Sequence, residues 1–194
     1  VTDFADTRNI GAYSLSPDGK SVVLQILEKE RVEQRTKYGN RTWYKDEWLS
    51  NLWISSTEGI GGLQRLTHGK WMDLSPSYSP SGDLVYFGSN RAGTPNIWRL
   101  STTAVGGLVM VTSSQTSDIN PVVSPDGKTL MYSAFMSDSK IPQIWTKPID
   151  KGLPMQIREG HDAVWSPDGK CIMFSAQERS KGAFKIWTMG LNGE

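Results

Sequence analysis

The sequence is poor in the residues that most often carry chemistry. It contains one cysteine, Cys171, so an internal disulfide is excluded. Its two histidines, His68 and His161, lie in no spaced Cys/His pattern, so we predict neither a metal site nor a cofactor. A Gly-x-Ser-x-Gly segment is absent as well, which argues against a serine hydrolase site in this chain. We therefore expect a protein without enzyme activity of its own.

Strong charge and long apolar runs are also lacking. The 21 basic and 20 acidic residues leave a net charge of +1, which does not favour nucleic acid as a partner. No apolar run approaches the roughly 20 residues of a membrane span. The chain starts at Val1 without a charged-then-apolar leader, so we expect either a removed leader or an excised piece.

Three short marks recur along the chain in a fixed order. The first is Ser-Pro-Asp-Gly-Lys at 16–20, 124–128 and 166–170, with the variant Ser-Pro-Ser-Gly-Asp at 79–83. The second is an aliphatic residue followed by tryptophan, at Trp53, Trp98, Trp145 and Trp187. The third is a glycine-rich turn before an apolar strand, at 62–67, 107–112 and 152–157. A period of about 40–45 residues is that of a four-stranded propeller blade.

Each mark has a structural reason. Proline and Asp-Gly together favour a tight turn between antiparallel strands. The strand after each turn is apolar on both faces, as in sheets stacked face to face. The sequence therefore predicts an all-β protein, a β-propeller with four four-stranded blades. We expect the four repeated tryptophans to lie in its core.

The order Leu-Thr, Pro, Ser-Pro-Asp-Gly, apolar strand and Ile-Trp resembles the TolB-type (WD-repeat-like) β-propeller repeat. Similar repeats form the propellers of prolyl-oligopeptidase-family peptidases. The resemblance covers essentially the whole chain, with departures at Ser81, which replaces the turn aspartate, and at Ala163, which replaces a proline. It implies a periplasmic or secreted protein, and rings of six or more blades.

The repeat also sets the blade boundaries. Blades 1 to 4 are predicted at about 12–67, with an insertion at 28–50, then 76–112, 121–157 and 162–190. The segment 1–4 resembles a fourth strand, and could complete blade 4. Two arrangements stay open: a closed ring of four blades, or a segment of a larger ring, which the repeat type favours. Self-association would follow if the ring is incomplete.

Candidate binding residues lie in the loops that enter the inner strands. Asp73 and Asp118 occupy equivalent positions, whereas Asp162 stands two positions further on, where Ser75 and Asn120 stand. With His161, these carboxylates could bind a cation or a basic peptide at the channel mouth. Alternatively, each aspartate caps its own turn, and His161 is structural.

The insertion at 28–50 is the second candidate. Its second half concentrates aromatic side chains beside basic ones, as recognition surfaces do. The candidate contacts are Tyr38, Arg41, Trp43, Tyr44 and Trp48. In the alternative interpretation, the insertion is a flap that packs these aromatics onto its own blade.

These observations favour a non-catalytic scaffold that binds a protein or peptide through the face formed by the insertion and the entering loops. One alternative is an accessory propeller of a larger hydrolase or peptidase, as the resemblance permits. Another is a small-ligand site, for example for a sugar, at the channel mouth.

Overall fold

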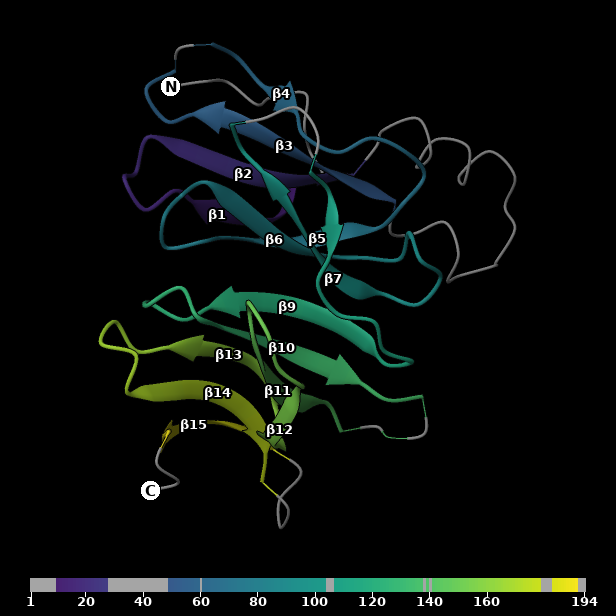
Figure 1. Ribbon diagram of the computed structural model, residues 1–194, viewed down its shortest axis with the longest axis vertical. Coiled ribbons are helices and arrows are strands. Elements are labelled where there is room, and N and C mark those ends of the chain that lie inside the picture. Colours follow the sequence, from purple (N-terminus) through teal and green to yellow (C-terminus); the bar gives the residue numbers. More distant parts are fainter. Residues whose placement is uncertain are drawn as a thin grey trace.

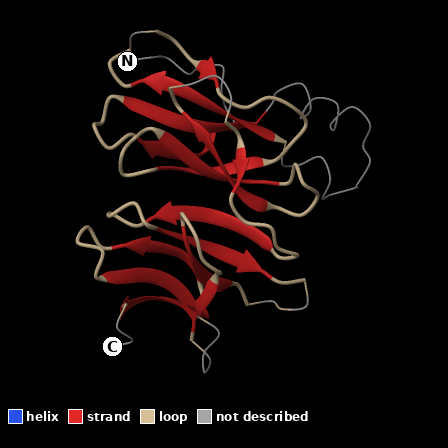
Figure 2. Ribbon diagram, in the orientation of Figure 1, coloured by secondary structure: helices blue, strands red, loops and turns tan. Residues whose placement is uncertain are grey.

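The computed structural model describes residues 10–27, 49–59, 61–103, 107–137, 139, 141–178 and 183–191. Every regular element in this part of the chain is a β-strand, as Figure 2 shows. None of the described residues forms a helix long and apolar enough to cross a membrane.

The strands form four antiparallel sheets, and each sheet is one blade. Blade 1 contains β1 (Ile10–Leu15), β2 (Ser21–Leu27), β3 (Ser50–Ser56) and β4 (Gln64–Arg65). Blade 2 contains β5 (Asp73–Tyr78), β6 (Leu84–Ser89), β7 (Asn96–Ser101) and β8 (Val109–Met110). Blade 3 contains β9 (Ser117–Val123), β10 (Thr129–Phe135), β11 (Gln143–Pro148) and β12 (Met155–Glu159). Blade 4 contains β13 (His161–Trp165), β14 (Cys171–Gln177) and β15 (Phe184–Gly190).

The blades follow one another in chain order, and Figure 1 shows blades 1 and 4 at opposite ends of the molecule. The inner strands β1, β5, β9 and β13 pack in this order from one blade to the next. The predicted all-β propeller of four blades is thus confirmed. The predicted closing strand at 1–4 lies outside the described residues, so it stays a prediction.

The Ser-Pro-Asp-Gly turns join the first and second strands of each blade, as predicted. In blade 1, Oγ of Ser16 donates a 2.6 Å hydrogen bond to Asp18, which also accepts one from the backbone N–H of Lys20. Gly19 takes a φ of 70° at the point where the turn needs the left-handed region. In blade 2, where Ser81 replaces the aspartate, Asp83 accepts the hydroxyl hydrogen bonds of the turn instead.

The threonines that follow β4 and β8 have a specific structural role. The side-chain oxygen of Thr67 accepts a 2.8 Å hydrogen bond from the backbone N–H of Leu52 on β3. Thr112 does the same for Ile97 on β7, at 2.9 Å. The threonine thereby satisfies a buried backbone donor at the point where the short fourth strand leaves the sheet.

Hydrophobic clusters fill the three boundaries between successive blades. Each blade has a preceding face, which packs on the blade before it, and a following face, which packs on the blade after it. In blade 2, the preceding face presents Tyr78, Val85 and Phe87, and the following face presents Tyr86 and Ile97. The strands between two such faces are apolar on both sides for this reason.

The repeated tryptophans are less buried than the sequence predicts. In blades 1 to 3, the residue before the tryptophan of the third strand is fully buried: Leu52, Ile97 and Ile144 are each 0% exposed. Trp53, Trp98 and Trp145 are half-buried, and Trp187 is 42% exposed. Trp98 and Trp145 pack against the clusters between the blades as partly buried residues. The prediction of a tryptophan core is wrong in this respect.

Candidate functional site

The candidate residues predicted in the entering loops of blades 2, 3 and 4 lie instead near the beginning of the inner strands β5, β9 and β13. These three strands share an unusual backbone geometry there. Ser75, Asn120 and Asp162 have φ angles of 52°, 54° and 52°, in the left-handed region. Each stands where the register between its inner strand and the second strand is interrupted, so each is part of a β-bulge. This conformation costs on the order of 1 kcal/mol or more for a residue other than glycine. Three successive blades thus use the same strained position to direct a polar side chain.

These three side chains are hydrogen-bonded to one another across the blade boundaries. Oγ of Ser75 donates to Oδ1 of Asn120, and Nδ2 of Asn120 donates to Oδ1 of Asp162, both at 2.6 Å. At one end, the backbone N–H of Ser75 donates to Oε1 of Gln25 on β2, at 3.2 Å. At the other end, Nδ1 of His161 lies 2.8 Å from Oδ2 of Asp162. We call these five residues the polar ladder.

The ladder becomes more accessible from blade 1 to blade 4. Gln25 is buried, Ser75 and Asn120 are half-buried, and the side chain of Asp162 is 61% exposed. The exposed end is therefore a carboxylate that its neighbours hold in place. The ring of Phe184, itself 62% exposed, meets the imidazole of His161 edge-on with a centroid separation of 5.3 Å. Asp162 and Phe184 thus both contact the imidazole of His161, and a carboxylate and an aromatic ring arranged in this way are suited to a cationic or polar ligand group.

The other two predicted carboxylates lie inside their blades. Asp73 is 0% exposed, and its Oδ1 accepts hydrogen bonds of 2.6 Å from Oγ of Ser89 and from Nη2 of Arg91. The guanidinium of Arg91 in turn stacks over the rings of Phe87 and Trp98, with 5.3 Å to each centroid. This group is a buried ion pair that connects the start of β5 to the link after β6.

Asp118 has the equivalent place in blade 3 with different partners. It is 0% exposed and accepts hydrogen bonds from the hydroxyls of Ser114, at 2.8 Å, and Thr116, at 2.6 Å. Burial raises the pKa of Asp118 above its ordinary value, although these hydroxyls act in the opposite direction. Of the four carboxylate and histidine candidates, the structure leaves His161 and Asp162 accessible to a ligand.

The five aromatic and basic candidates of the insertion lie outside the described residues. These are Tyr38, Arg41, Trp43, Tyr44 and Trp48. The described part resumes at Leu49, and Ser50 is fully buried, with its Oγ donating a 2.6 Å hydrogen bond to the backbone oxygen of Asp73. The end of the insertion is therefore fixed to the start of β5.

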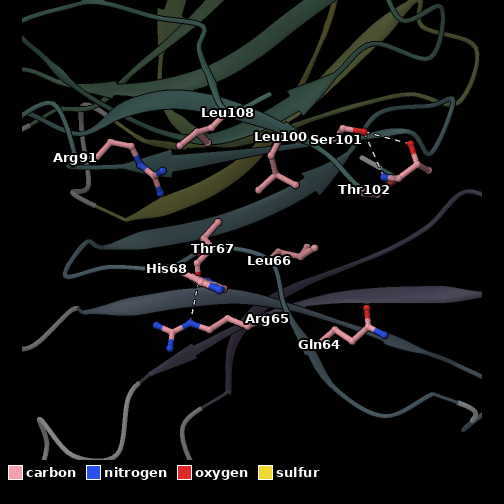
Figure 3. Close-up of a pocket in the computed structure, with 11 residues that line it drawn as sticks. Gln64, Arg65, Leu66, Thr67, His68, Arg91, Leu100, Ser101, Thr102 and Leu108 are labelled. Atoms are coloured by element: carbon pink, nitrogen blue, oxygen red, sulfur yellow. Dashed lines mark hydrogen bonds between the residues drawn. The ribbon is translucent and has the colours of Figure 1, made fainter. Parts of the chain in front are cut away.

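A groove that the sequence did not indicate runs between blades 1 and 2. Figure 3 shows its lining, from β4 and the segment after it on one side and from β7 and the segment before β8 on the other. Its volume is about 580 Å³. Arg65, His68 and Arg91 supply basic groups, and the described residues that line the groove include no carboxylate. The Nε of Arg65 donates to the backbone oxygen of Thr67, at 2.9 Å, and its guanidinium lies over the ring of Trp53.

The sequence analysis identified Asp162 and His161, at the exposed end of the ladder, as candidate binding residues. It did not identify Ser75 and Asn120, in the middle of the ladder, as candidates. The signal was present, because Ser75 and Asn120 share a repeat position with Asp162. The groove has no comparable signal, since its basic residues come from separate repeat positions. Among the described residues, no group of three or more His, Cys, Asp or Glu side chains is arranged to hold a metal ion.

Comparison with solved structures supports the architecture. TolB from Acinetobacter baumannii superposes with a TM-score of 0.72 at 22% identity, over 94% of this chain and 41% of that structure's chain. The oligogalacturonate lyase from Vibrio parahaemolyticus gives 0.67 at 12%, over 94% and 51%. The propeller domain of the trilobed protease from Pyrococcus furiosus gives 0.62 at 10%, over 96% and 55%. This chain therefore spans about half the length of these structures, and identities this low show the fold alone.

The sequence comparisons identify the family of the chain but not its function. No curated protein sequence matches the chain. The model of the TolB β-propeller domain matches residues 43–194, which is most of the chain and includes blades 2, 3 and 4 completely. The chain therefore belongs to the TolB β-propeller domain family.

Proposed function

We propose that this propeller is a binding module that holds an extended peptide segment of a protein partner along the polar ladder. The observation that carries the proposal is the exposed carboxylate of Asp162, fixed by Asn120 and His161 at the accessible end of the ladder. Pre-organised polar groups bind with a smaller loss of conformational entropy than mobile ones.

The ladder side chains retain hydrogen-bonding capacity for such a ligand. The amide of Asn120 has a second Nδ2 hydrogen beyond the one that it donates to Asp162. The carboxylate of Asp162 can accept further hydrogen bonds, and it attracts a lysine, arginine or amino-terminal group. The ligand is therefore a peptide with exposed main-chain amides and a positive charge close to Asp162. A periplasmic or secreted location, which the family resemblance supports, belongs to the same proposal.

The test is selection of ligands from a library of random displayed peptides. We expect the enriched peptides to carry lysine or arginine, and their affinity to fall about tenfold or more in Asp162→Ala and in Asn120→Ala, as for the loss of a charge-assisted contact. Asp150→Ala is the matched control, because Asp150 is an exposed carboxylate on another part of blade 3. Equal affinities for Asp162→Ala and Asp150→Ala would remove the ladder as the binding site.

The similarity to a lyase and to a protease propeller favours a second candidate, an accessory propeller that serves a catalytic domain. In that case the channel mouth admits a sugar or a peptide substrate. Oligogalacturonate is the probe that separates the two candidates in the same assay. Binding of the oligosaccharide, together with no enriched peptides, would favour the second candidate.

A further inference from the structure

The groove between blades 1 and 2 differs in chemistry from one end to the other. Figure 3 shows Arg65, His68 and Arg91 gathered at one end. The side chains of Leu66 and Leu100 lie in the middle. Uncharged polar residues line the other end: Gln64, Ser101 and Thr102. The groove thus has a basic end and an apolar middle, and its volume of about 580 Å³ is in the usual range for small-molecule sites, about 300–1,000 Å³.

The guanidinium of Arg65 is held in position at the basic end. Its Nε donates a 2.9 Å hydrogen bond to the backbone oxygen of Thr67, and the group lies over the ring of Trp53, with 5.6 Å to the centroid. A guanidinium carries five N–H groups, so it can contact a ligand in addition to its partners within the protein. These donors lie in one plane and match the oxygen atoms of a carboxylate or a phosphate. An anion that reaches this end therefore meets a donor group that is already oriented.

The other two basic residues add donors rather than a second fixed charge. His68 is exposed and presents a ring N–H in either tautomer. The charge of Arg91 is balanced by its ion pair with Asp73, so Arg91 serves as part of the wall. The described residues that line the groove include no carboxylate, so none of them repels an anionic ligand. The chemistry of the lining thus favours an anion.

The packing of two blades does not require a wide basic groove. The residue that pairs with the repeated tryptophan is Arg65 in blade 1 but Met110 in blade 2. The residue after the threonine is His68 in blade 1 but Ser113 in blade 2. The corresponding groove between blades 2 and 3 has a volume of about 100 Å³. The size and the basic residues of the larger groove are therefore not consequences of the repeat.

We propose that the groove between blades 1 and 2 binds a small organic anion. The carboxylate or phosphate of this ligand lies at the basic end, against Arg65 and His68, and its apolar body lies along Leu66 and Leu100. Burial of that body against the two leucines removes apolar surface from water, whereas the guanidinium selects for the negative charge. This site is separate from the polar ladder, and the proposal does not depend on peptide binding there.

The experiment is a titration of the 194-residue chain, followed by NMR, with four small probes. Octyl phosphate and octanoate carry both features of the proposed ligand, whereas octanol lacks the charge and inorganic phosphate lacks the apolar body. We expect each amphipathic anion to bind about tenfold or more tightly than octanol and than inorganic phosphate. The tighter of the two anions identifies the preferred head group.

Three variants locate the binding. Arg65→Met introduces the residue that blade 2 carries at this position, and it should weaken octyl phosphate binding about tenfold or more without changing that of octanol. Leu108→Glu places a negative charge on the opposite wall, at a side chain that is 42% exposed, and should weaken octyl phosphate binding as well. Lys147→Met is the control, because it removes the same charge from the groove between blades 2 and 3.

The proposal would be overturned if octanol bound as tightly as octyl phosphate, or if none of the four probes bound. Wild-type affinity in Arg65→Met would overturn it too, and so would an equal loss in Lys147→Met, which would indicate a general effect of net charge. Urea denaturation verifies that each variant is folded, and Leu108→Glu decides the question if Arg65→Met is not. Peptides selected on the ladder should bind all three variants unchanged, so failure of this proposal and failure of the ladder are separate results.

Discussion

Nη2 of Arg91 lies 2.6 Å from Oδ1 of Asp73, and both side chains are buried inside blade 2. The pair connects the start of the inner strand β5 with the link between the second and third strands. Because the ladder residue Ser75 follows Asp73 by two positions, the ion pair also helps to position Ser75. The carboxylate of Asp73 was a candidate ligand contact, but it instead stabilises the strand that carries the ladder residue Ser75.

Removing Arg91 should destabilise the protein strongly. Arg91→Ala leaves the carboxylate of Asp73 buried without its cation, which typically costs about 3–5 kcal/mol in the free energy of unfolding. The double variant Arg91→Ala/Asp73→Asn should recover part of this loss, since no buried charge remains. Urea denaturation measures both, with the exposed Lys128→Ala as control. A loss below about 1 kcal/mol for Arg91→Ala would mean that water reaches the pair.

The contribution of Asp118 to stability should change with pH in the direction opposite to that of the turn aspartates. Burial raises its pKa in the folded state, so its contribution to stability is complete below the ordinary value of 3.8 and is lost as the pH rises through the folded-state pKa. Asp118→Asn, which cannot ionise, should therefore gain stability relative to the wild-type protein between about pH 4 and pH 7. Denaturation at several pH values tests this prediction. A constant difference between the two proteins would show that the pKa of Asp118 is not raised.

The turn aspartates have lowered pKa values because serine hydroxyls donate to them. Asp126, for example, accepts from Ser124 and from the backbone N–H of Lys128. Such a group contributes stability above its ordinary pKa, and the contribution is lost as the pH falls through the folded-state value. Asp126→Asn should therefore show a difference from the wild-type protein that shrinks as the solution is acidified below about pH 4, which serves as the contrast to Asp118.

The fold could be predicted from the sequence because the repeated motifs of the sequence determine local backbone geometry. A Ser-Pro-Asp-Gly turn is decided within five residues, and an apolar strand on each side of it completes a hairpin. The depth of burial is not a local property. Trp98 and Ile97 are neighbours on β7, yet only Ile97 is fully buried: it belongs to the cluster between blades 2 and 3, whereas Trp98 packs partly buried against the cluster between blades 1 and 2.

The candidate site depends on contacts between distant residues, and so it was only partly predictable. Ser75 and Asn120 are 45 residues apart, and their hydrogen bond exists only because neighbouring blades bring the inner strands together. Repeat alignment could show that the two residues are equivalent. It could not show that they touch, nor that Asp73 is paired with Arg91 inside the blade.

Equivalent isoleucines should differ sharply in their contribution to stability. Ile97→Ala creates a cavity between blades 2 and 3, which typically costs about 2–5 kcal/mol. Ile186→Ala removes a side chain that is 74% exposed and should cost less than about 0.5 kcal/mol. Urea denaturation of both variants gives the comparison. Similar losses at the two positions would contradict the described difference in burial.

Substitutions at Asn120 can separate the effect of backbone strain on stability from the effect of the Asn120 amide on peptide binding. At a φ of 54°, alanine is strained whereas glycine is not, so Asn120→Ala should be less stable than Asn120→Gly by about 1 kcal/mol. Both variants lose the amide and should bind the selected peptide equally weakly. Thermal denaturation and calorimetric titration measure the two effects. Wild-type affinity in Asn120→Gly would show that the amide makes no ligand contact.

The position of a bound peptide decides whether the polar ladder is the binding site. A selected peptide that carries a benzophenone group is irradiated in complex with the protein, and the cross-linked residues are identified by mass spectrometry. We predict cross-links to the beginnings of the inner strands, at 72–75, 117–120 and 160–164, which carry the ladder. Cross-links confined to the groove at 64–68 and 100–103, with none at the inner strands, would show that the ladder is not the binding site.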